Sequence, residues 1–249
     1  MSFRMNRFLK IPFALSLAAL FVSCSTPTTP SSTGRDVWGH RPGPKGFKTV
    51  IIDAGHGGKD SGAVSPHTGL KEKDLALDTA KRIANELRGD FKVILMRGDD
   101  TFIDLDERVI RANQQGGAIL VSMHYNSGPS GSGIRGPETY YWRVDSHGLA
   151  VRCQQAMAGV CPDESGNRGM VRRRIRLTRN PEIPCLLLEG GYLSNSGESH
   201  LVADPGYRQK LANAIAGAIR TQAAIGDSGT GPLPPPLNAP PSRPTDTKE

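Results

Sequence analysis

The sequence predicts an α/β fold, a single domain in which a mixed, twisted sheet is covered by helices on both faces. Two observations carry this prediction. Short apolar runs alternate with longer segments whose apolar residues recur every three or four positions, which is the pattern of strands alternating with helices. The alternation occupies residues 45–226, and a stretch of about 180 residues suits one domain with one core. We find no internal repeat in it.

The strands are expected where apolar runs are short and bounded by polar or turn-forming residues. The helices are expected where apolar residues are spaced by three or four. The expected strands cover residues 47–53, 91–96, 118–123, 138–142 and 184–188, and the expected helices cover residues 74–87, 104–115 and 146–158, with a last helix opening at Asp204-Pro205.

Three of these helices show an apolar face in the sequence. The first places Leu75, Thr79, Ile83 and Leu87 on one side, and the second turns Leu105, Val109 and Ala112 inward. In the last helix Asp204 is a good cap and Pro205 suits the first turn. Its inward face is expected to consist of Tyr207, Leu211, Ile215 and Ile219.

Residues 1–24 predict an export signal. Three basic residues precede an apolar run over residues 11–22, which is about 12 residues long and falls short of the roughly 20 that a spanning helix needs. The run ends in Phe21-Val22-Ser23-Cys24, which resembles a bacterial lipobox and implies that Cys24 becomes the lipid-modified first residue of an envelope protein. Phe21 departs from the usual Leu, so cleavage to a soluble product remains the alternative.

The segments that flank the domain differ from it in composition. Residues 25–44 are rich in Ser, Thr, Pro and Gly and predict a flexible tether. Residues 227–249 are rich in Pro and predict a disordered or polyproline-like tail, with a partner-binding motif as the less favoured interpretation.

The net charge limits the classes of binding partner, and the cysteine positions limit the possible disulfides and metal sites. A net charge of +7 fits an anionic partner, which for an exported chain is a cell-wall polymer or a lipid surface and not nucleic acid. Cys153 and Cys161 are near enough in sequence to form a disulfide, and the sequence leaves that pairing open. Cys185 lies in an apolar run and predicts a buried small side chain. These spacings do not support a metal site made of cysteines alone.

Polar residues stand at the ends of several expected elements, where ligands gather in α/β sheets. His56 follows the first strand between glycines, which carry no side chains and let metal and substrate approach the backbone. Glu72 opens the first helix and His124 ends the third strand. Two imidazoles and one carboxylate are a ligand set that catalytic zinc uses. Taken singly, each has a structural explanation, such as a first-turn charge for Glu72.

Glu189 ends the most apolar of the expected strands. A carboxylate there is costly unless it is paired or catalytic. Burial would raise its pKa toward that of a useful general base. The alternative is a salt bridge to one of the arginines nearby in the sequence.

Four segments, in this order, resemble the zinc-dependent N-acetylmuramoyl-L-alanine amidases of the amidase 3 type, and the resemblance runs from about residue 48 to residue 224. The segments are Ile52-Asp53-Ala54-Gly55-His56-Gly57-Gly58, Gly69-Leu70-Lys71-Glu72-Lys73, Ser122-Met123-His124-Tyr125-Asn126-Ser127 and Leu188-Glu189-Gly190-Gly191-Tyr192-Leu193-Ser194-Asn195. The chain departs from the family at Met123, Tyr125 and Gly190-Gly191-Tyr192, which affects the shape of the pocket more than its chemistry.

The resemblance implies a zinc-assisted hydrolase of peptidoglycan with a phosphorylase/hydrolase-like zinc fold, acting as a monomer in the cell envelope. It implies that His56, Glu72 and His124 bind one Zn²⁺ and that Glu189 is the catalytic carboxylate. Glu138 matches a family segment near the site, and we expect it to hydrogen-bond a metal ligand. Asn126, in the third segment, is a further candidate for the site.

An arginine-rich stretch from Arg168 to Arg179 precedes the Glu189 strand. Because stem peptides carry carboxylates, which suit the fork of arginine, one or two of these residues are candidates for lining the substrate groove, and Arg174 and Arg176 are the pair that we select. A solvated basic face is the alternative for each of them.

Two other functions remain open from the sequence. One is a zinc exopeptidase of the envelope, which would use similar ligands. The other is a lipid-anchored protein that binds peptidoglycan without cutting it, although every position that the chemistry needs is filled.

Overall fold

The computed structural model describes residues 41–162, 166–235, 237 and 243. The expected export signal (1–24), the tether up to residue 40 and most of the tail beyond residue 235 lie outside the described residues. In the part of the chain that is described, no helix is both long enough and apolar enough to span a bilayer.

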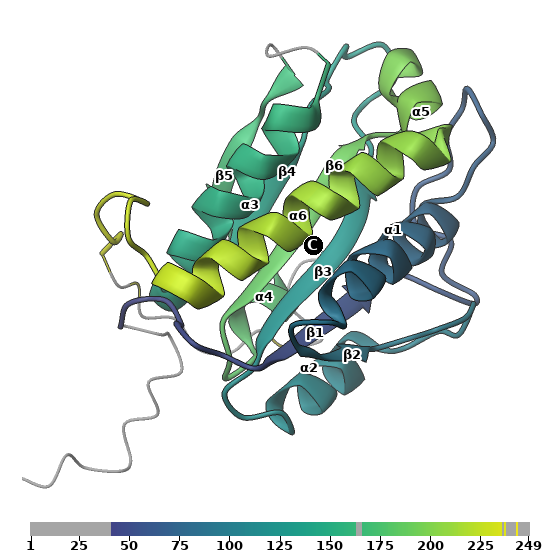
Figure 1. The fold of residues 1–249 in the computed structure, drawn as a ribbon. Coiled ribbons are helices and arrows are strands. Elements are labelled where there is room, and N and C mark those ends of the chain that lie inside the picture. Colours follow the sequence, from purple (N-terminus) through teal and green to yellow (C-terminus); the bar gives the residue numbers. More distant parts are fainter. Residues whose placement is uncertain (1–40, 163–165, 236, 238–242, 244–249) are drawn as a thin grey trace, which may run out of the picture. The chain divides into compact units, whose positions relative to one another are not determined.

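A six-stranded sheet forms the centre of the domain (Figure 1). Its strands are β1 (Thr49–Ala54), β2 (Lys92–Leu95), β3 (Ile119–Asn126), β4 (Glu138–Tyr141), β5 (Gly169–Arg172) and β6 (Cys185–Tyr192), in the spatial order β2-β1-β3-β6-β4-β5. Strands β2, β1, β3 and β6 run parallel, β4 is antiparallel to β6, and β5 is parallel to β4. The mixed sheet that the sequence predicts is confirmed.

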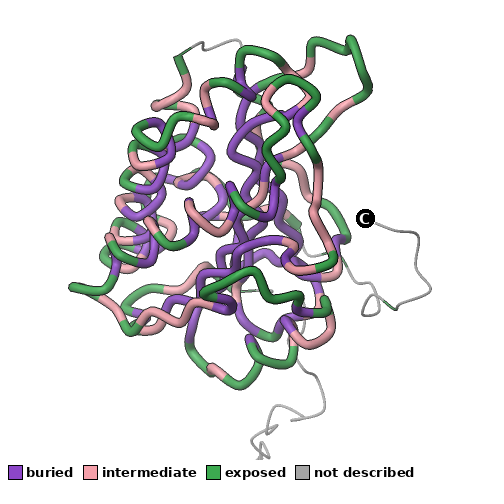
Figure 2. The backbone as a smooth tube through the Cα atoms, turned by 90° about the vertical axis from the view of Figure 1, so that its right-hand side faces the viewer, coloured by how far each residue is buried: buried purple, intermediate pink, exposed green. Residues whose placement is uncertain are grey.

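One face of the sheet is covered by three long helices, α1 (Glu72–Leu87), α3 (His147–Val160) and α6 (Pro205–Ile225), which lie across the front of the view in Figure 1. Alternate strand residues, such as Ile52, Val121 and Leu188, point to this side and form the larger core with the helices. The four inward positions expected in the last helix are all buried. Figure 2 shows the buried backbone concentrated in the sheet and along the inner sides of these helices.

The opposite face carries a smaller core, because its covering helices are short. The strand residues that alternate with those of the larger core, such as Ile51, Leu120 and Cys185, point to this face and pack against α2 (Leu105–Asn113) and α4 (Arg176–Arg179). Helices therefore cover both faces, as predicted, but unequally. This second face, toward the carboxyl ends of β3 and β6, is where the polar residues collect.

Several boundaries differ from the sequence-based expectation. Strand β3 continues to Asn126 and β6 to Tyr192, so His124 and Glu189 lie inside strands and not at their ends. The expectation that Leu105 points inward is wrong: it is the first residue of α2 and is 38% exposed. The expected elements do not include β5, α4 or α5 (Ser196–Ala203), nor the 3-10 turn Val144–Ser146 before α3.

The tail also begins later than its composition suggests. The Asp227 carboxylate accepts hydrogen bonds from the backbone N–H of Gly43, at 2.6 Å, and from the Gln222 amide, at 2.9 Å. Thr230 is buried and donates to the Asp227 carbonyl. Residues 227–230 therefore pack on the domain, and the last residues of the expected tether pack with them.

The three cysteines of the domain are free thiols, and two of them are buried in the core. Cys153 and Cys161 are both free, so the disulfide that the sequence left open is not formed, and Cys185 is buried as expected. Burial raises the pKa of the Cys153 and Cys185 thiols to about 12. Both thiols are therefore protonated and unreactive at neutral pH.

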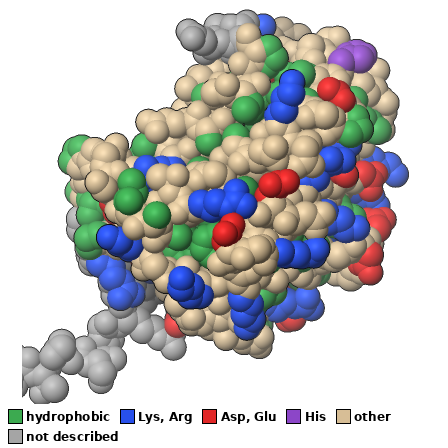
Figure 3. Space-filling view, viewed as in Figure 1, with side chains coloured by type: hydrophobic (Ala, Val, Ile, Leu, Met, Phe, Trp, Pro, Cys, Tyr) green, Lys and Arg blue, Asp and Glu red, His purple; other side chains and the backbone are tan. Residues whose placement is uncertain are grey.

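The helical side of the surface carries acidic and basic side chains interspersed, as Figure 3 shows. Ion pairs on this side include Arg82 with Asp78 on α1, and Arg208 of α6 with the same Asp78. Arg82 and Asp78 are both partly exposed, so their pair adds little stability, whereas the Arg208 side chain is buried.

Candidate active site

Three adjacent strands bring three functional candidates into one row. In the sheet register His124 of β3 is paired with Glu189 of β6, and Glu189 is paired with Glu138 of β4. Side chains in register on neighbouring strands point to the same face. This row lies on the side of the sheet that the long helices leave free.

His56 reaches the row from a tight turn after β1. Its backbone φ is 59°, in the left-handed region, and it is the one described non-glycine residue with positive φ. Such a conformation costs of order 1–3 kcal/mol and persists only where neighbours enforce it. A two-residue bridge between Gly57 and Asp60 closes the turn, with N–H to carbonyl distances of 3.0 and 3.1 Å.

Two buried arginines hold this turn. Arg108 of α2 donates to the carbonyls of Ala54, at 2.9 Å, and His56, at 2.7 Å. Arg97 donates to the carbonyls of Ala54 and Gly55, at 2.9 and 2.7 Å. Five-donor guanidinium groups can satisfy several carbonyls at once, so these two side chains fix the strained backbone that presents His56.

The charge of Arg108 is balanced within the fold. Its guanidinium pairs with the fully buried carboxylate of Asp53 on β1, which also accepts a 2.6 Å hydrogen bond from the Ser122 hydroxyl of β3. A buried pair satisfied in this way is costly to break from one side. Asp53 therefore has a structural part in the site, although it lines the same pocket as the histidines.

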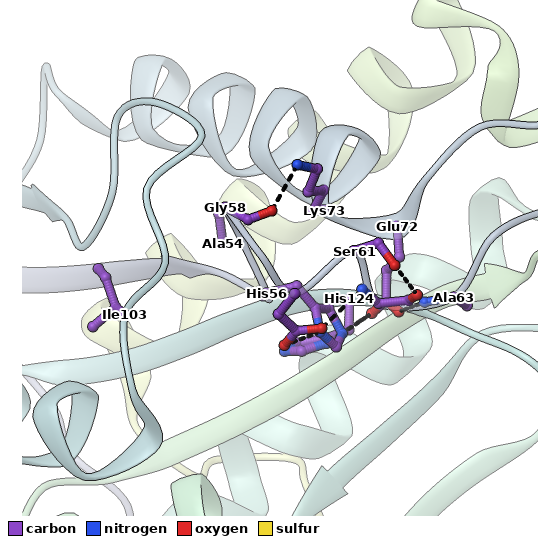
Figure 4. A network of polar contacts seen from close by, with 12 residues as sticks. Ala54, His56, Gly58, Ser61, Ala63, Glu72, Lys73, Ile103 and His124 are labelled. Atoms are coloured by element: carbon purple, nitrogen blue, oxygen red, sulfur yellow. Dashed lines mark hydrogen bonds and ion pairs between the residues drawn. The ribbon is translucent and has the colours of Figure 1, made fainter.

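Glu72 is the centre of the polar cluster shown in Figure 4. Its carboxylate oxygen Oε1 lies 2.9 Å from His56 Nε2 and 2.8 Å from His124 Nδ1. Its other oxygen accepts the backbone N–H of Ala63 at 2.9 Å. Burial alone would raise the pKa of Glu72, but hydrogen bonds from His124 and His56 outweigh it, so the pKa falls below its ordinary value.

Asp60 orients His56 from the other side of the ring. Its carboxylate lies 2.8 Å from His56 Nδ1, which leaves Nε2 directed at Glu72. Burial lowers the pKa of His56, but Glu72 and Asp60 outweigh burial and raise it. A carboxylate on the second nitrogen is the usual device that fixes the orientation of a metal-binding histidine. Asp60 was not among the residues predicted for the site.

His56, Glu72 and His124 have the geometry of a metal site. One ligand atom from each lies within 4.8 Å of the other two, and the two imidazole rings meet edge to face at a centroid distance of 4.9 Å. Two nitrogens and one carboxylate oxygen are donors suited to Zn²⁺, and three protein ligands leave a coordination position open. The residues present therefore fit the metal that the sequence predicts.

Glu189 faces this cluster with an unused carboxylate oxygen. The residue is 9% exposed, and its Oε2 atom is buried without a hydrogen-bond partner among the described residues. Burial raises the pKa of Glu189 well above its usual range, and the nearby carboxylates of Glu72 and Glu138 raise it further. The alternative of an arginine salt bridge is not what the structure shows.

Glu138 has different partners from those expected. Its Oε2 atom accepts hydrogen bonds from the hydroxyls of Tyr140 and Tyr192, both at 2.8 Å, and its Oε1 lies 3.7 Å from Arg168. The expected hydrogen bond from Glu138 to a metal ligand is therefore wrong. Asn126 joins the same group, because its amide donates to the Tyr192 hydroxyl at 3.2 Å and its side chain lines the pocket.

A pocket of about 550 Å³ opens over these residues. Its lining includes His56, Glu72, His124 and Glu189, and the other lining residues include Phe102, Leu105, Tyr140, Arg173, Ile175 and Leu187. Arg174 and Arg176, the arginines selected from the sequence, do not line it. Arg174 is exposed, and Arg176 lies 3.7 Å from Asp106 of α2.

The comparison that decides the family is with a sequence profile of N-acetylmuramoyl-L-alanine amidases of the amidase 3 type, which matches residues 50–221. The chain belongs to this family. The match spans the three residues of the cluster, His56, Glu72 and His124, and also Glu189, so the amidase resemblance inferred from the motifs is confirmed.

Solved amidase structures share the fold. The N-acetylmuramoyl-L-alanine amidase of Clostridium difficile 630 is 34% identical, with a TM-score of 0.67 over 72% of this chain and 97% of that one. The catalytic domain of CwlV from Bacillus (Paenibacillus) polymyxa var. colistinus is 35% identical, with a TM-score of 0.66 over 70% and 97%. Among curated relatives, the amidase LytC of Bacillus subtilis strain 168 is 32% identical over 68% of this chain, but the match spans only 34% of LytC.

Three glycines near the metal-binding candidates make room for close contacts inside the protein. A Cβ atom on Gly55 would lie 2.2 Å from His124 Cε1, and one on Gly62 would lie 2.5 Å from a Glu72 carboxylate oxygen. A Cβ on Gly57 would meet the Thr101 carbonyl at 2.2 Å. Gly55 and Gly62 thus let the metal-binding candidates approach the chain, and Gly57 lets the loop at residue 101 pack on the turn.

Replacing Gly55 by Ala is expected to displace the His124 ring and weaken metal binding. No real Cβ atom sits 2.2 Å from a ring carbon, so either the imidazole rotates away from Glu72 or β1 shifts. Zinc affinity measured by competition with a chelating dye should fall by at least about tenfold, the scale of a disturbed ligand orientation.

Gly89 is a suitable control for this experiment, because a Cβ atom there meets nothing within 4 Å. The Gly89→Ala protein should bind zinc like the unchanged chain. Equal zinc affinity of the Gly55→Ala protein would show that the ring is not held by this close approach.

Proposed function

We propose that this member of the peptidoglycan hydrolase family is an exported, zinc-dependent N-acetylmuramoyl-L-alanine amidase. It cleaves the amide bond between N-acetylmuramic acid and the L-alanine of the stem peptide. The observation that carries the proposal is the pairing of a two-histidine, one-glutamate cluster with a buried carboxylate, Glu189, that has an unused oxygen facing the same pocket. A binding protein without activity has no need of such a costly group.

The residues that would hold the metal are His56, Glu72 and His124, with Asp60 fixing the His56 ring. Zinc bound there would lower the pKa of water and polarise the substrate carbonyl. Glu189 takes a proton from the attacking water as the oxygen bonds to the lactyl carbonyl carbon. It then gives this proton to the alanine nitrogen as the carbon–nitrogen bond breaks, which leaves a muramic acid carboxyl group and a free stem-peptide amine.

The location in the cell is part of the proposal. The expected export signal and the lipobox-like Cys24 support a protein in the cell envelope, held at a membrane by the lipid on Cys24. Labelling of the protein by a radioactive fatty acid in the bacterium, lost in a Cys24→Ala variant, is the expected result. Unlabelled protein in the culture medium would favour a soluble exported product.

Product analysis tests the proposed activity. The purified, zinc-loaded protein is incubated with peptidoglycan, and the products are separated and weighed by mass spectrometry. An amidase releases intact stem peptides and leaves muramic acid residues with a free lactyl carboxyl group. Release of single amino acids would instead show an exopeptidase, and unchanged peptidoglycan would show a binding protein.

A further inference from the structure

The pocket continues away from the metal cluster over an apolar part of the sheet surface, which forms the floor of the pocket. Leu187 stands two residues before Glu189 on β6, on the same face, and is paired in register with Tyr140 of β4. Leu187, Tyr140 and Ile175 form an apolar cluster that is also part of the pocket wall. Two strand residues span about 7 Å, so this floor extends roughly one to two peptide residues from the reacting bond.

Arg173 lies at the far end of that floor. It directly follows β5, and its backbone N–H donates to the Tyr141 carbonyl at 3.0 Å. Because β4 and β5 run antiparallel to β6, this position is displaced from Glu189 in the direction of the Leu187 side chain. Arg173 is exposed and lines the pocket.

The guanidinium of Arg173 is available for a ligand. Among the residues that the structure describes, none forms a hydrogen bond or ion pair with its side chain. Arg108, the other cation of the pocket wall, has its donors occupied by Asp53 and by three backbone carbonyls. Arg173 is therefore the pocket cation that can accept an anionic group from the substrate.

The cavity on the other side of the site lacks such a group. It has a volume of about 580 Å³, meets the first pocket at Ser127, and is lined by Val64, Pro66, His67, residues 127–128 and 130–134, and residues 194–196. None of these lining residues is a lysine, an arginine or a carboxylate. An acidic portion of the substrate therefore finds its partner on the Arg173 side.

We infer that Arg173 binds the α-carboxylate of the second stem residue and makes the enzyme selective for stems in which that carboxylate is free. This inference rests on the proposed amidase function and names a specificity residue for it. In the substrate the residue after L-alanine is a D-glutamate linked through its γ-carboxyl, so its α-carboxylate is the first anionic group beyond the scissile bond. An apolar floor with an arginine at its end matches an alanine methyl group followed by a carboxylate.

The test compares two muropeptides that differ in one group, N-acetylmuramoyl-L-Ala-D-Glu-L-Lys and the same compound with D-isoglutamine. Active protein is assayed for kcat/KM, and Glu189→Gln protein is used for equilibrium binding, so that affinity is measured without turnover. For the wild-type chain, both KM and Kd should be about tenfold lower for the muropeptide with the free carboxylate. This is the effect expected of one charge-assisted hydrogen bond at a solvent-accessible site. The Arg173→Gln change should bring both ratios close to one.

Arg174→Gln is the matched control, because Arg174 is adjacent and exposed but does not line the pocket. It should keep the full preference. Equal affinity of the wild-type site for the two muropeptides, or an undiminished preference in the Arg173→Gln protein, overturns the inference. Absence of hydrolysis together with a retained Kd preference would sink the proposed amidase function and leave the carboxylate site standing.

Discussion

Replacing Glu189 by Gln should reduce amide hydrolysis by about 10²–10⁴-fold, the range that a positioned general base contributes. The reason is local: Glu189 is buried in the wall of the pocket, its Oε2 has no partner, and its pKa is raised by burial and by Glu72 and Glu138. A carboxylate of raised pKa takes and returns a proton readily, whereas a carboxamide of the same size does neither. Stem-peptide release from purified peptidoglycan measures the loss.

The same variant should still bind zinc, because Glu189 is not one of the three residues of the ligand cluster. Zinc content by atomic absorption and the thermal midpoint of unfolding should both match the unchanged protein or exceed it, since a buried unpaired carboxylate is itself destabilising. Glu107→Gln is the control for loss of a carboxylate, because Glu107 lies on α2 with its side chain 46% exposed. Turnover of the Glu189→Gln protein at the rate of the control would remove Glu189 from the mechanism.

Replacing His124 by Ala should abolish activity through loss of the metal. His124 Nδ1 lies 2.8 Å from Glu72 Oε1, and its ring packs edge to face on His56. Removing it leaves two ligands and deprives the buried Glu72 of one of its partners. Zinc affinity should fall by more than the 10–100-fold that loss of an outer partner costs.

His200 supplies the control for this change, because it is an exposed histidine of α5 whose ring contacts the Ser196 carbonyl of its own helix. His200→Ala should bind zinc and hydrolyse substrate normally. One equivalent of zinc held by the His124→Ala protein with unchanged affinity would show that the metal site lies elsewhere.

The sequence predicted the layers of the fold and the four central residues of the site because local patterns encode them. The spacing of four in residues 74–87 gives the first helix its buried face, and His56, Glu72, His124 and Glu189 each stand in a recognisable motif. It placed the ends of β3 and β6 too early. In the structure β6 continues through Gly190-Gly191 to Tyr192, which pairs with Asn126 of β3.

The remaining parts of the site depend on long-range contacts that no local pattern shows. Arg97 and Arg108 resemble ordinary charged residues in the sequence, yet both are buried against the carbonyls of the His56 turn. Asp60 could have been found from the sequence, since it stands four residues after His56 and two residues beyond the glycine motif. The position at which β5 ends decides which arginine of the arginine-rich stretch lines the pocket. The residues of β5 show no alternation of apolar and polar side chains, so the sequence does not predict this strand or its end.

A zinc titration of the metal-free protein tests the central claim most directly. The full chain is stripped with a chelator, dialysed, and assayed for release of stem peptides as Zn²⁺ is added in known amounts. Activity should rise linearly and reach its maximum at one zinc per chain, with the Glu189→Gln protein taking up the same single zinc and staying inactive. Full release of stem peptides by the metal-free protein, or a maximum that does not depend on zinc, would contradict the account.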